Sequence, residues 1–218
     1  MALTIFDLDN TLLQGDSDYE WGQFLVAKNL VDAKKYEAAN KVFYDDYKNG
    51  TLDIYKFSSF SFQPLATRTM DELAELHTEY LTTIIKPIIG KKSRDLVAKH
   101  KQQGDTLIVI TATNSFITGP IVKELGIDNL LATDPLIENG RYTTKVDGIP
   151  CFQEGKITRL KQWLEDNNEK MEGSTFYSDS YNDISLLEAV DTAIAVDPDE
   201  KLREVAISRG WDVISLRK

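Results

Sequence analysis

Short runs of hydrophobic residues recur along the chain, and each is followed by a cluster of polar residues. The first run (ALTIFDL) contains β-branched and aromatic residues and stops at the polar turn DNT. Runs of this length and composition are typical of strands that are buried on both faces. The pattern therefore predicts a sheet whose strands end in polar turns. The runs cover residues 2–8, 106–110, 174–177 and 192–196, with a shorter one, WDVISL, near the end of the chain.

Between these runs, the hydrophobic positions follow a helical spacing. In residues 156–167, for example, Ile157, Leu160 and Leu164 fall on one face of a helix. Strands that alternate with helices indicate βαβ units and a mostly parallel sheet. We therefore predict an α/β fold. The other predicted helices cover residues 93–103, 116–125, 183–189 and 199–208.

One long segment interrupts this alternation. Residues 16–83 are rich in aromatic residues, follow a helical pattern and contain no strand-like run. We predict a helical insert after the first strand, placed over the sheet edge, with the core formed by residues 1–15 and 84–218. Most of its aromatic side chains should form a small core, and a few should line a substrate pocket. A second, smaller excursion is expected at residues 136–152, where Asn139-Gly140 between β-rich runs predicts a hairpin.

Composition and charge narrow the classes of function. The chain has 218 residues, of which 42% are hydrophobic, and this length supports one core with a smaller insert. Its formal net charge is -10, so nucleic acid and anionic membranes are not expected as partners. The same charge repels phosphate esters. A site for a phosphate ester would therefore need a local positive charge from a metal, a lysine or backbone amides.

The single cysteine and the N-terminal residues bear on the compartment. With Cys151 alone, neither an intrachain disulfide nor a cysteine zinc cluster is expected. The N-terminus lacks the basic start and long apolar run of a signal peptide. No stretch approaches the ~20 apolar residues that a membrane helix needs. We expect a cytoplasmic protein, and its oligomeric state stays open.

Polar side chains at the ends of three predicted strands supply the candidate chemistry. Asp7 and Asp9 lie at the end of the first strand, Thr111 follows the second, and Asp179 and Asp183 follow the third. In open α/β sheets, ligands bind beyond the carboxyl ends of the strands. Several carboxylates in one place are costly unless a cation neutralises them, and a few hard oxygen ligands suit Mg²⁺. The sequence thus predicts a magnesium site at this edge of the sheet.

Four stretches of the chain resemble the motifs of the haloacid dehalogenase (HAD) superfamily, in the same order. The first motif, DxDxT, is similar to Phe6–Thr11 (FDLDNT), and the second, a Thr or Ser after a hydrophobic strand, is similar to Ile110–Thr113 (ITAT). Lys156 falls at the place of the third-motif lysine, and Ser178–Asp183 (SDSYND) resembles the fourth motif. DxDxT alone is a moderate signal, whereas four motifs in order across nearly the whole chain are highly specific. The resemblance implies a Rossmann-like parallel sheet with an inserted helical cap.

The position of the insert indicates a branch of this superfamily. A helical insert between motifs one and two is similar to the phosphoserine phosphatase-like branch, subfamily IB. Within that branch, the stretches GDSDYEWG, YSDSYNDISLLEAVD and RGWDVISLR look closest to the histidinol-phosphate phosphatases. The resemblance implies a Mg²⁺-dependent hydrolase that acts on a small phosphorylated metabolite.

The resemblance also implies a role for each motif residue. Asp7 would be the nucleophile that forms an aspartyl-phosphate, and Asp9 would be the general acid and then the base. Mg²⁺ would be held by Asp7, the backbone carbonyl of Asp9 and Asp179, with Asp183 acting through water or a neighbouring ligand. The expected phosphate-binding groups are the Thr111 hydroxyl, the Ala112 amide, Lys156 and Asn182.

The sequence indicates the substrate less clearly than it indicates the catalytic residues. In phosphoserine phosphatases an arginine of the cap binds the substrate carboxylate, and the corresponding place here holds Ser61, with Arg68 several residues away. The acidic residue that binds the substrate amine in that family has a counterpart in Asp16. An acid without an arginine suits an amino-alcohol phosphate such as histidinol phosphate. Its imidazole could pack on cap aromatics such as Trp21, Phe57 or Phe60, so the predicted specificity residues are Asp16, Trp21, Phe57 and Ser61.

Other classes of protein also fit these residues. Taken singly, Asp9-Asn10-Thr11 and Thr111 are also explained as helix caps. A phosphoserine phosphatase, another small-metabolite phosphatase, or a phosphomutase or phosphotransferase would use the same motifs. A non-catalytic binding module would be expected to lack Asp7 or Asp9, and both are present. In a haloacid dehalogenase proper, Asp9 would have no leaving alkoxide to protonate.

Overall fold

A mostly parallel sheet forms the centre of the computed structural model, which describes residues 2–217. Among these residues, seven strands pair in the order β4-β3-β2-β1-β5-β6-β7. The β3–β4 pair is antiparallel, and the other neighbouring pairs are parallel. The strands are β1 (Leu3–Phe6), β2 (Thr106–Asn114), β3 (Asn129–Glu138), β4 (Arg141–Asp147), β5 (Thr175–Ser178), β6 (Thr192–Val196) and β7 (Asp212–Ile214).

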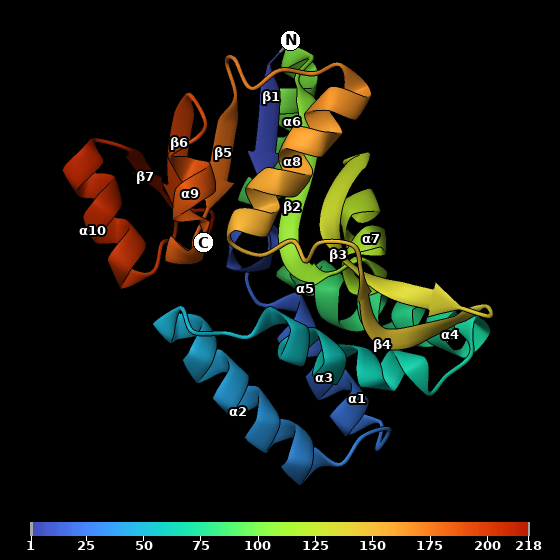
Figure 1. The fold of residues 1–218 in the computed structure, drawn as a ribbon. Helices are drawn as coiled ribbons and strands as arrows, with labels where there is room; N and C mark the ends of the chain where they lie inside the picture. Colours follow the sequence, from blue (N-terminus) through green and yellow to red (C-terminus); the bar gives the residue numbers. More distant parts are fainter. Residues whose placement is uncertain (1, 218) are drawn as a thin grey trace.

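Hydrophobic residues on both faces of the sheet are buried under helices. Because side chains alternate along a strand, Leu3 and Ile5 belong to one core cluster and Phe6 to the other. The Phe6 cluster includes residues of α6 (Lys91–Gln103) and α7 (Ser115–Glu124). The Leu3 cluster includes residues of α8 (Glu154–Asn167), α9 (Ile184–Leu187) and α10 (Glu200–Arg209), and Figure 1 shows α8 crossing that face. The predicted α/β fold is confirmed.

Four helices fill the segment that was predicted to be a helical insert. They are α1 (Ser17–Ala27), α2 (Ala33–Asn49), α3 (Ile54–Ala66) and α4 (Met70–Tyr80), and in Figure 1 they lie beyond the carboxyl end of the sheet. We call residues 16–83 the insert. The short segments η2 (Leu81–Ile85) and α5 (Lys86–Ile88) lead back to the sheet.

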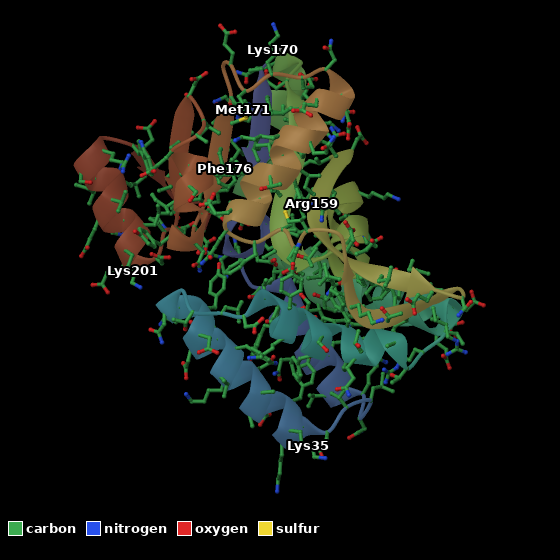
Figure 2. The ribbon with its side chains drawn as sticks, viewed as in Figure 1. Lys35, Arg159, Lys170, Met171, Phe176 and Lys201 are labelled. Carbon is green, nitrogen blue, oxygen red and sulfur yellow. The ribbon has the colours of Figure 1, made fainter. Side chains whose placement is uncertain are left out.

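The insert shares its core with one face of the sheet. Trp21 of α1 and Phe62 of α3 belong to the same buried cluster as Phe6 of β1. The far end of α2, marked by Lys35 in Figure 2, points away from the sheet, whereas its other end reaches α10. There, Lys201 donates a hydrogen bond to the carbonyl of Lys48 (3.3 Å). The insert therefore packs onto the core at more than one place.

The edge of the sheet differs from the prediction. The expected hairpin is present, and Asn139 and Gly140 both have positive φ, as a tight two-residue turn requires. However, β3 begins at Asn129 and first pairs with β2, so the hairpin continues the main sheet. β4 then packs along α3 of the insert. The polar residues and Pro135 within β3 break up the hydrophobic run that would have revealed this strand.

Candidate active site

The predicted motif residues meet in one cleft between the carboxyl end of the sheet and the insert. The cleft has a volume of about 160 Å³. Its lining includes every residue predicted for catalysis, phosphate binding or metal binding: Asp7, Asp9, Thr111, Ala112, Lys156, Asp179, Asn182 and Asp183. Four distant stretches of the chain are thus brought together.

Asp7 lies at the bottom of this cleft and is held on both sides. Its backbone N–H donates to the carbonyl of Tyr177 in β5, which fixes the strand end. One carboxylate oxygen is 2.9 Å from Lys156 Nζ, and the other accepts a hydrogen bond from the Thr11 hydroxyl (3.2 Å). Burial raises the pKa of Asp7 to about 7, an effect that the Lys156 ammonium opposes and the charge of Asp183 increases.

Lys156 is buried between two carboxylates. Besides Asp7, its ammonium contacts both oxygens of Asp183 at 2.7 and 2.8 Å. These negative charges outweigh burial and hold the pKa of Lys156 well above its usual value. A side chain on Gly155 would place its Cβ 2.0 Å from the carbonyl oxygen of Pro150. Glycine therefore lets α8 begin close enough to the sheet for Lys156 to reach Asp7.

Asp9 is held at the start of α1. One of its oxygens accepts from the backbone N–H of Ser17 (2.6 Å), a position where the helix dipole favours a negative charge. The other accepts from the hydroxyls of Thr113 (2.9 Å) and Thr111 (3.4 Å). Burial, with the nearby charge of Asp16, raises the pKa of Asp9 to about 6. A carboxyl with this pKa can both give and take a proton near neutral pH.

The residues around Asp7 suit a divalent cation. The Thr11 hydroxyl lies 3.2 Å from an oxygen of Asp7 and 3.2 Å from an oxygen of Asp179. Burial and the charge of Asp7 raise the pKa of Asp179 well above its usual value, so this pair lacks enough positive charge. No three acidic, histidine or cysteine side chains among residues 2–217 form a closed cation site. Mg²⁺ commonly uses one or two carboxylates with water and substrate phosphate, and the pair fits that donor set.

The wall formed by the insert is acidic and aromatic. Asp16 and Asp18 both line the cleft, and burial raises the pKa of each to about 6. Lys156 is the only lysine or arginine among the described lining residues, and it is already paired. This end of the cleft therefore favours a positively charged group on the substrate. The aromatic residues of this wall are Tyr19, Phe43, Tyr44, Tyr47 and Phe57.

The four predicted specificity residues divide into two groups. Asp16 and Phe57 line the cleft. Trp21 does not, because it is only 1% exposed and packs among aromatic side chains such as Tyr80 and His77, so the expectation that it contacts substrate is corrected. Ser61 is also buried and does not line the cleft. It contacts a lining residue instead, because its hydroxyl donates a hydrogen bond to Asp18 (2.6 Å).

Two further expectations are clarified by hydrogen bonds. The guanidinium of Arg68 donates to the backbone carbonyls of Pro64 and Leu30, outside the cleft, so it does not stand in for a carboxylate-binding arginine. The amide of Asn182 accepts from Gln153 (3.3 Å) and donates to the carbonyl of Tyr47 (3.2 Å). Asn182 therefore joins the core to the insert, and its predicted contact with phosphate stays a prediction.

Sequence reasoning missed several side chains that hold the site in place. Ser178 donates to Asp183 (2.7 Å), and Thr113 donates to Asp9. Arg217, near the C-terminus, donates to the carbonyls of Asn10 (2.9 Å) and Leu13 (3.4 Å) in the loop after β1. Ser178 and Thr113 lie at strand ends beside the motifs, which was a usable signal. Nothing in the spacing of the chain indicated Arg217.

Comparison with known proteins agrees with this geometry. The haloacid dehalogenase-like hydrolase family matches residues 4–188. The chain belongs to this family. A histidinol-phosphatase from Neisseria meningitidis is 46% identical over 99% of both chains. A protein of unknown function from Bordetella pertussis has a similar structure, with a TM-score of 0.93 and 41% identity over 99% of both chains.

More distant structures agree in fold alone. A substrate-bound phosphoserine phosphatase has a TM-score of 0.72 and 17% identity, with 99% of this chain and 93% of that chain covered. The predicted HAD core with an inserted helical cap is confirmed, as is the expectation of a phosphoric monoester hydrolase. Among residues 2–217, no helix combines the length and hydrophobicity that a membrane crossing would demand.

Proposed function

We propose that this HAD-family hydrolase is a Mg²⁺-dependent phosphatase that cleaves histidinol phosphate through an aspartyl-phosphate on Asp7. The observation that carries the proposal is the position of Asp7, at the bottom of a cleft between Lys156 and the Thr11–Asp179 pair. Asp7, the backbone carbonyl of Asp9 and Asp179 would hold the cation, with Asp183 acting through Lys156 and water. When bound, a divalent cation offsets the negative charge of the carboxylates and the phosphate.

In the first half-reaction, a carboxylate oxygen of Asp7 attacks phosphorus and the bond to the ester oxygen breaks. Asp9 gives its proton to the departing alkoxide, which leaves as the alcohol. Lys156, the Thr111 hydroxyl and the Ala112 amide stabilise the charge that develops on the phosphoryl oxygens. A pKa of about 6 lets Asp9 carry this proton in part of the population near neutral pH.

In the second half-reaction, Asp9 works in reverse. Now deprotonated, it takes a proton from a water molecule, and the water oxygen attacks the phosphorus of the aspartyl-phosphate. The bond between Asp7 and phosphorus breaks, which releases inorganic phosphate and restores both carboxyl groups to their starting states. The hydrogen bonds from Ser17 and Thr113 keep Asp9 in one orientation for both steps.

The insert wall supports histidinol phosphate as the substrate. This compound carries an amine and an imidazole and has no carboxylate. Asp16 and Asp18 suit the amine, the aromatic wall suits the ring, and neither the lining nor Arg68 supplies an arginine for a carboxylate. The 46% identity to a histidinol-phosphatase points to the same compound.

A substrate panel tests this proposal. The purified chain with Mg²⁺ should release phosphate from histidinol phosphate with a higher kcat/KM than from phosphoserine or other small phosphate esters. Product analysis with added alcohols separates hydrolysis from transfer of the phosphoryl group to an acceptor. Faster turnover of phosphoserine than of histidinol phosphate would contradict the assignment of the substrate.

A further inference from the structure

One polar group in the insert wall has no role in the chemistry described above. Asn40 of α2 lines the cleft, and its side-chain amide nitrogen is buried. No described residue accepts a hydrogen bond from that nitrogen. A buried donor without an acceptor is unusual, because it gives up its hydrogen bonds to water and gains none in return. A ligand in the cleft could supply the missing acceptor.

The surroundings of Asn40 belong to the cleft rather than to the interior of the insert. Asn40 lies four residues after Tyr36 and four before Tyr44, so the three lie on one face of α2. Burial raises the pKa of the Tyr36 hydroxyl, and the nearby charges of Asp18 and Asp16 raise it further. Asn40 thus sits on the α2 face that looks toward the acidic wall.

Acceptor and donor groups are therefore both available at this end of the cleft. Asp18 is 6% exposed, and the Ser61 hydroxyl fixes one of its oxygens at 2.6 Å. The Asn40 amide supplies a donor near the same wall. A neutral imidazole has one ring nitrogen that donates and one that accepts. A carboxylate and an amide N–H on the same wall match that pair of nitrogens.

We propose that Asn40 is a specificity-determining residue that donates a hydrogen bond to the unprotonated ring nitrogen of the substrate, while Asp18 accepts from the other ring nitrogen. This inference rests on the proposed function and deepens it. Asp16 remains free for the amine. Selection of this kind is strong because an analogue without the ring leaves the buried Asn40 donor unpaired.

The test compares two substrates at pH 8, where an imidazole with a pKa of about 6.5 is largely neutral. Histidinol phosphate has the ring, and phosphoethanolamine shares the amine and the phosphate but lacks it. In Asn40→Leu and Asn40→Asp, which keep the shape of the side chain and remove the donor, the ratio of kcat/KM for histidinol phosphate to that for phosphoethanolamine should fall roughly tenfold. The inhibition constant of histidinol should rise to a similar degree.

Asn49→Asp is the matched control. Asn49 is exposed on the same helix and does not line the cleft, and the variant adds the same charge as Asn40→Asp. It should leave the ratio and the histidinol inhibition constant unchanged. An unchanged ratio in both Asn40 variants, with an active wild type, overturns this inference alone. A wild type that does not hydrolyse histidinol phosphate overturns the proposed function and this inference with it.

Discussion

The two ends of the cleft differ in how their polar groups are paired. We call the end around Asp7, where we propose that phosphate binds, the phosphate end, and the end formed by the insert the insert end. At the phosphate end, Lys156 bridges Asp7 and Asp183, and Ser178 also donates a hydrogen bond to Asp183. At the insert end, Asp16 and Asp18 have no cationic partner among the described lining residues. The amide nitrogen of Asn40 has no acceptor within residues 2–217. The carboxylates around Asp7 therefore have a buried cation beside them, whereas those at the insert end have none among the described lining residues.

This contrast separates two tasks. In the proposed mechanism, the phosphate end binds a group that all phosphate monoesters share, so a change there should affect every substrate alike. The insert end meets the part that differs between substrates, so a change there should alter the ratio of rates between substrates. Variants at the two ends should therefore have different signatures in the same pair of assays.

The largest effect is expected from Asp7→Asn. The amide keeps the shape of the carboxylate but cannot form an aspartyl-phosphate, so kcat should fall by roughly 10⁴-fold or more on every substrate. Circular dichroism should show an unchanged fold. Turnover above about 1% of wild type would contradict the role of Asp7 as nucleophile.

Removal of divalent cations should also lower kcat on every substrate. After dialysis against EDTA, kcat should fall by at least about 100-fold for histidinol phosphate and phosphoethanolamine alike, and Mg²⁺ should restore both. Full activity after exhaustive chelation would contradict the cation site at Asp7 and Asp179. A loss confined to one substrate would contradict the assignment of the cation to the end of the cleft that all substrates share.

Lys156→Met tests whether the buried ammonium offsets the charges of Asp7 and Asp183, and the quantity measured is the free energy of unfolding. The variant keeps the aliphatic stem but leaves Asp7 and Asp183 without their buried cation, so the free energy of unfolding at pH 7 should fall by about 3–5 kcal/mol. Lys161→Met, at an exposed position of the same helix, should change it by no more than about 0.5 kcal/mol. Urea denaturation without metal compares the two. Equal stabilities would show that the buried ammonium does not balance these carboxylates.

The smallest effect is expected from pH at the insert end. Burial raises the pKa of Asp16 and Asp18 to about 6, so both gain protons and lose negative charge as the pH falls from 7.5 to 5. The ratio of kcat/KM for phosphoethanolamine to that for p-nitrophenyl phosphate, which has no amine, should fall about tenfold over this range.

Two N-cap variants sharpen the pH experiment. Asp16→Asn keeps the cap of α1 and removes a charge from the cleft, so it should flatten the pH dependence of the ratio. Asp32→Asn makes the same change at the cap of α2, outside the cleft, and should leave the pH dependence intact. The same pH dependence of this ratio in both variants would show that Asp16 does not bind the substrate amine.

The sequence predicted the phosphate end better than the insert end, for a physical reason. Carboxyl ends of parallel strands meet at one edge of a sheet, so the position of Asp7, Thr111 and Asp179 in the chain already implied that they converge. No such rule applies to helices of an insert. Trp21 and Phe57 both lie in aromatic helical stretches, and only packing decides that Phe57 lines the cleft while Trp21 is buried.

The features that escaped prediction share a lack of local signal. The strand β3 carries Pro135 and several polar residues, and its second half pairs with β4 after the pairing with β2 has ended. Asn40 is one polar residue in a mostly polar helix. It stands out only because its buried amide nitrogen has no acceptor among the described residues. A side chain at Gly155 would clash with the carbonyl oxygen of Pro150, and sequence spacing does not reveal this close approach.

Chemical trapping of the phosphorylated enzyme tests the central claim most directly. The chain is mixed with histidinol phosphate and Mg²⁺, quenched in acid within the first turnover, reduced with borohydride to convert an acyl-phosphate into an alcohol, and digested for mass spectrometry. We predict that the modified residue is Asp7 and that Asp7→Asn shows no modification. Modification of another residue, or steady turnover with no trapped intermediate at any quench time, would contradict the passage of the phosphoryl group through Asp7.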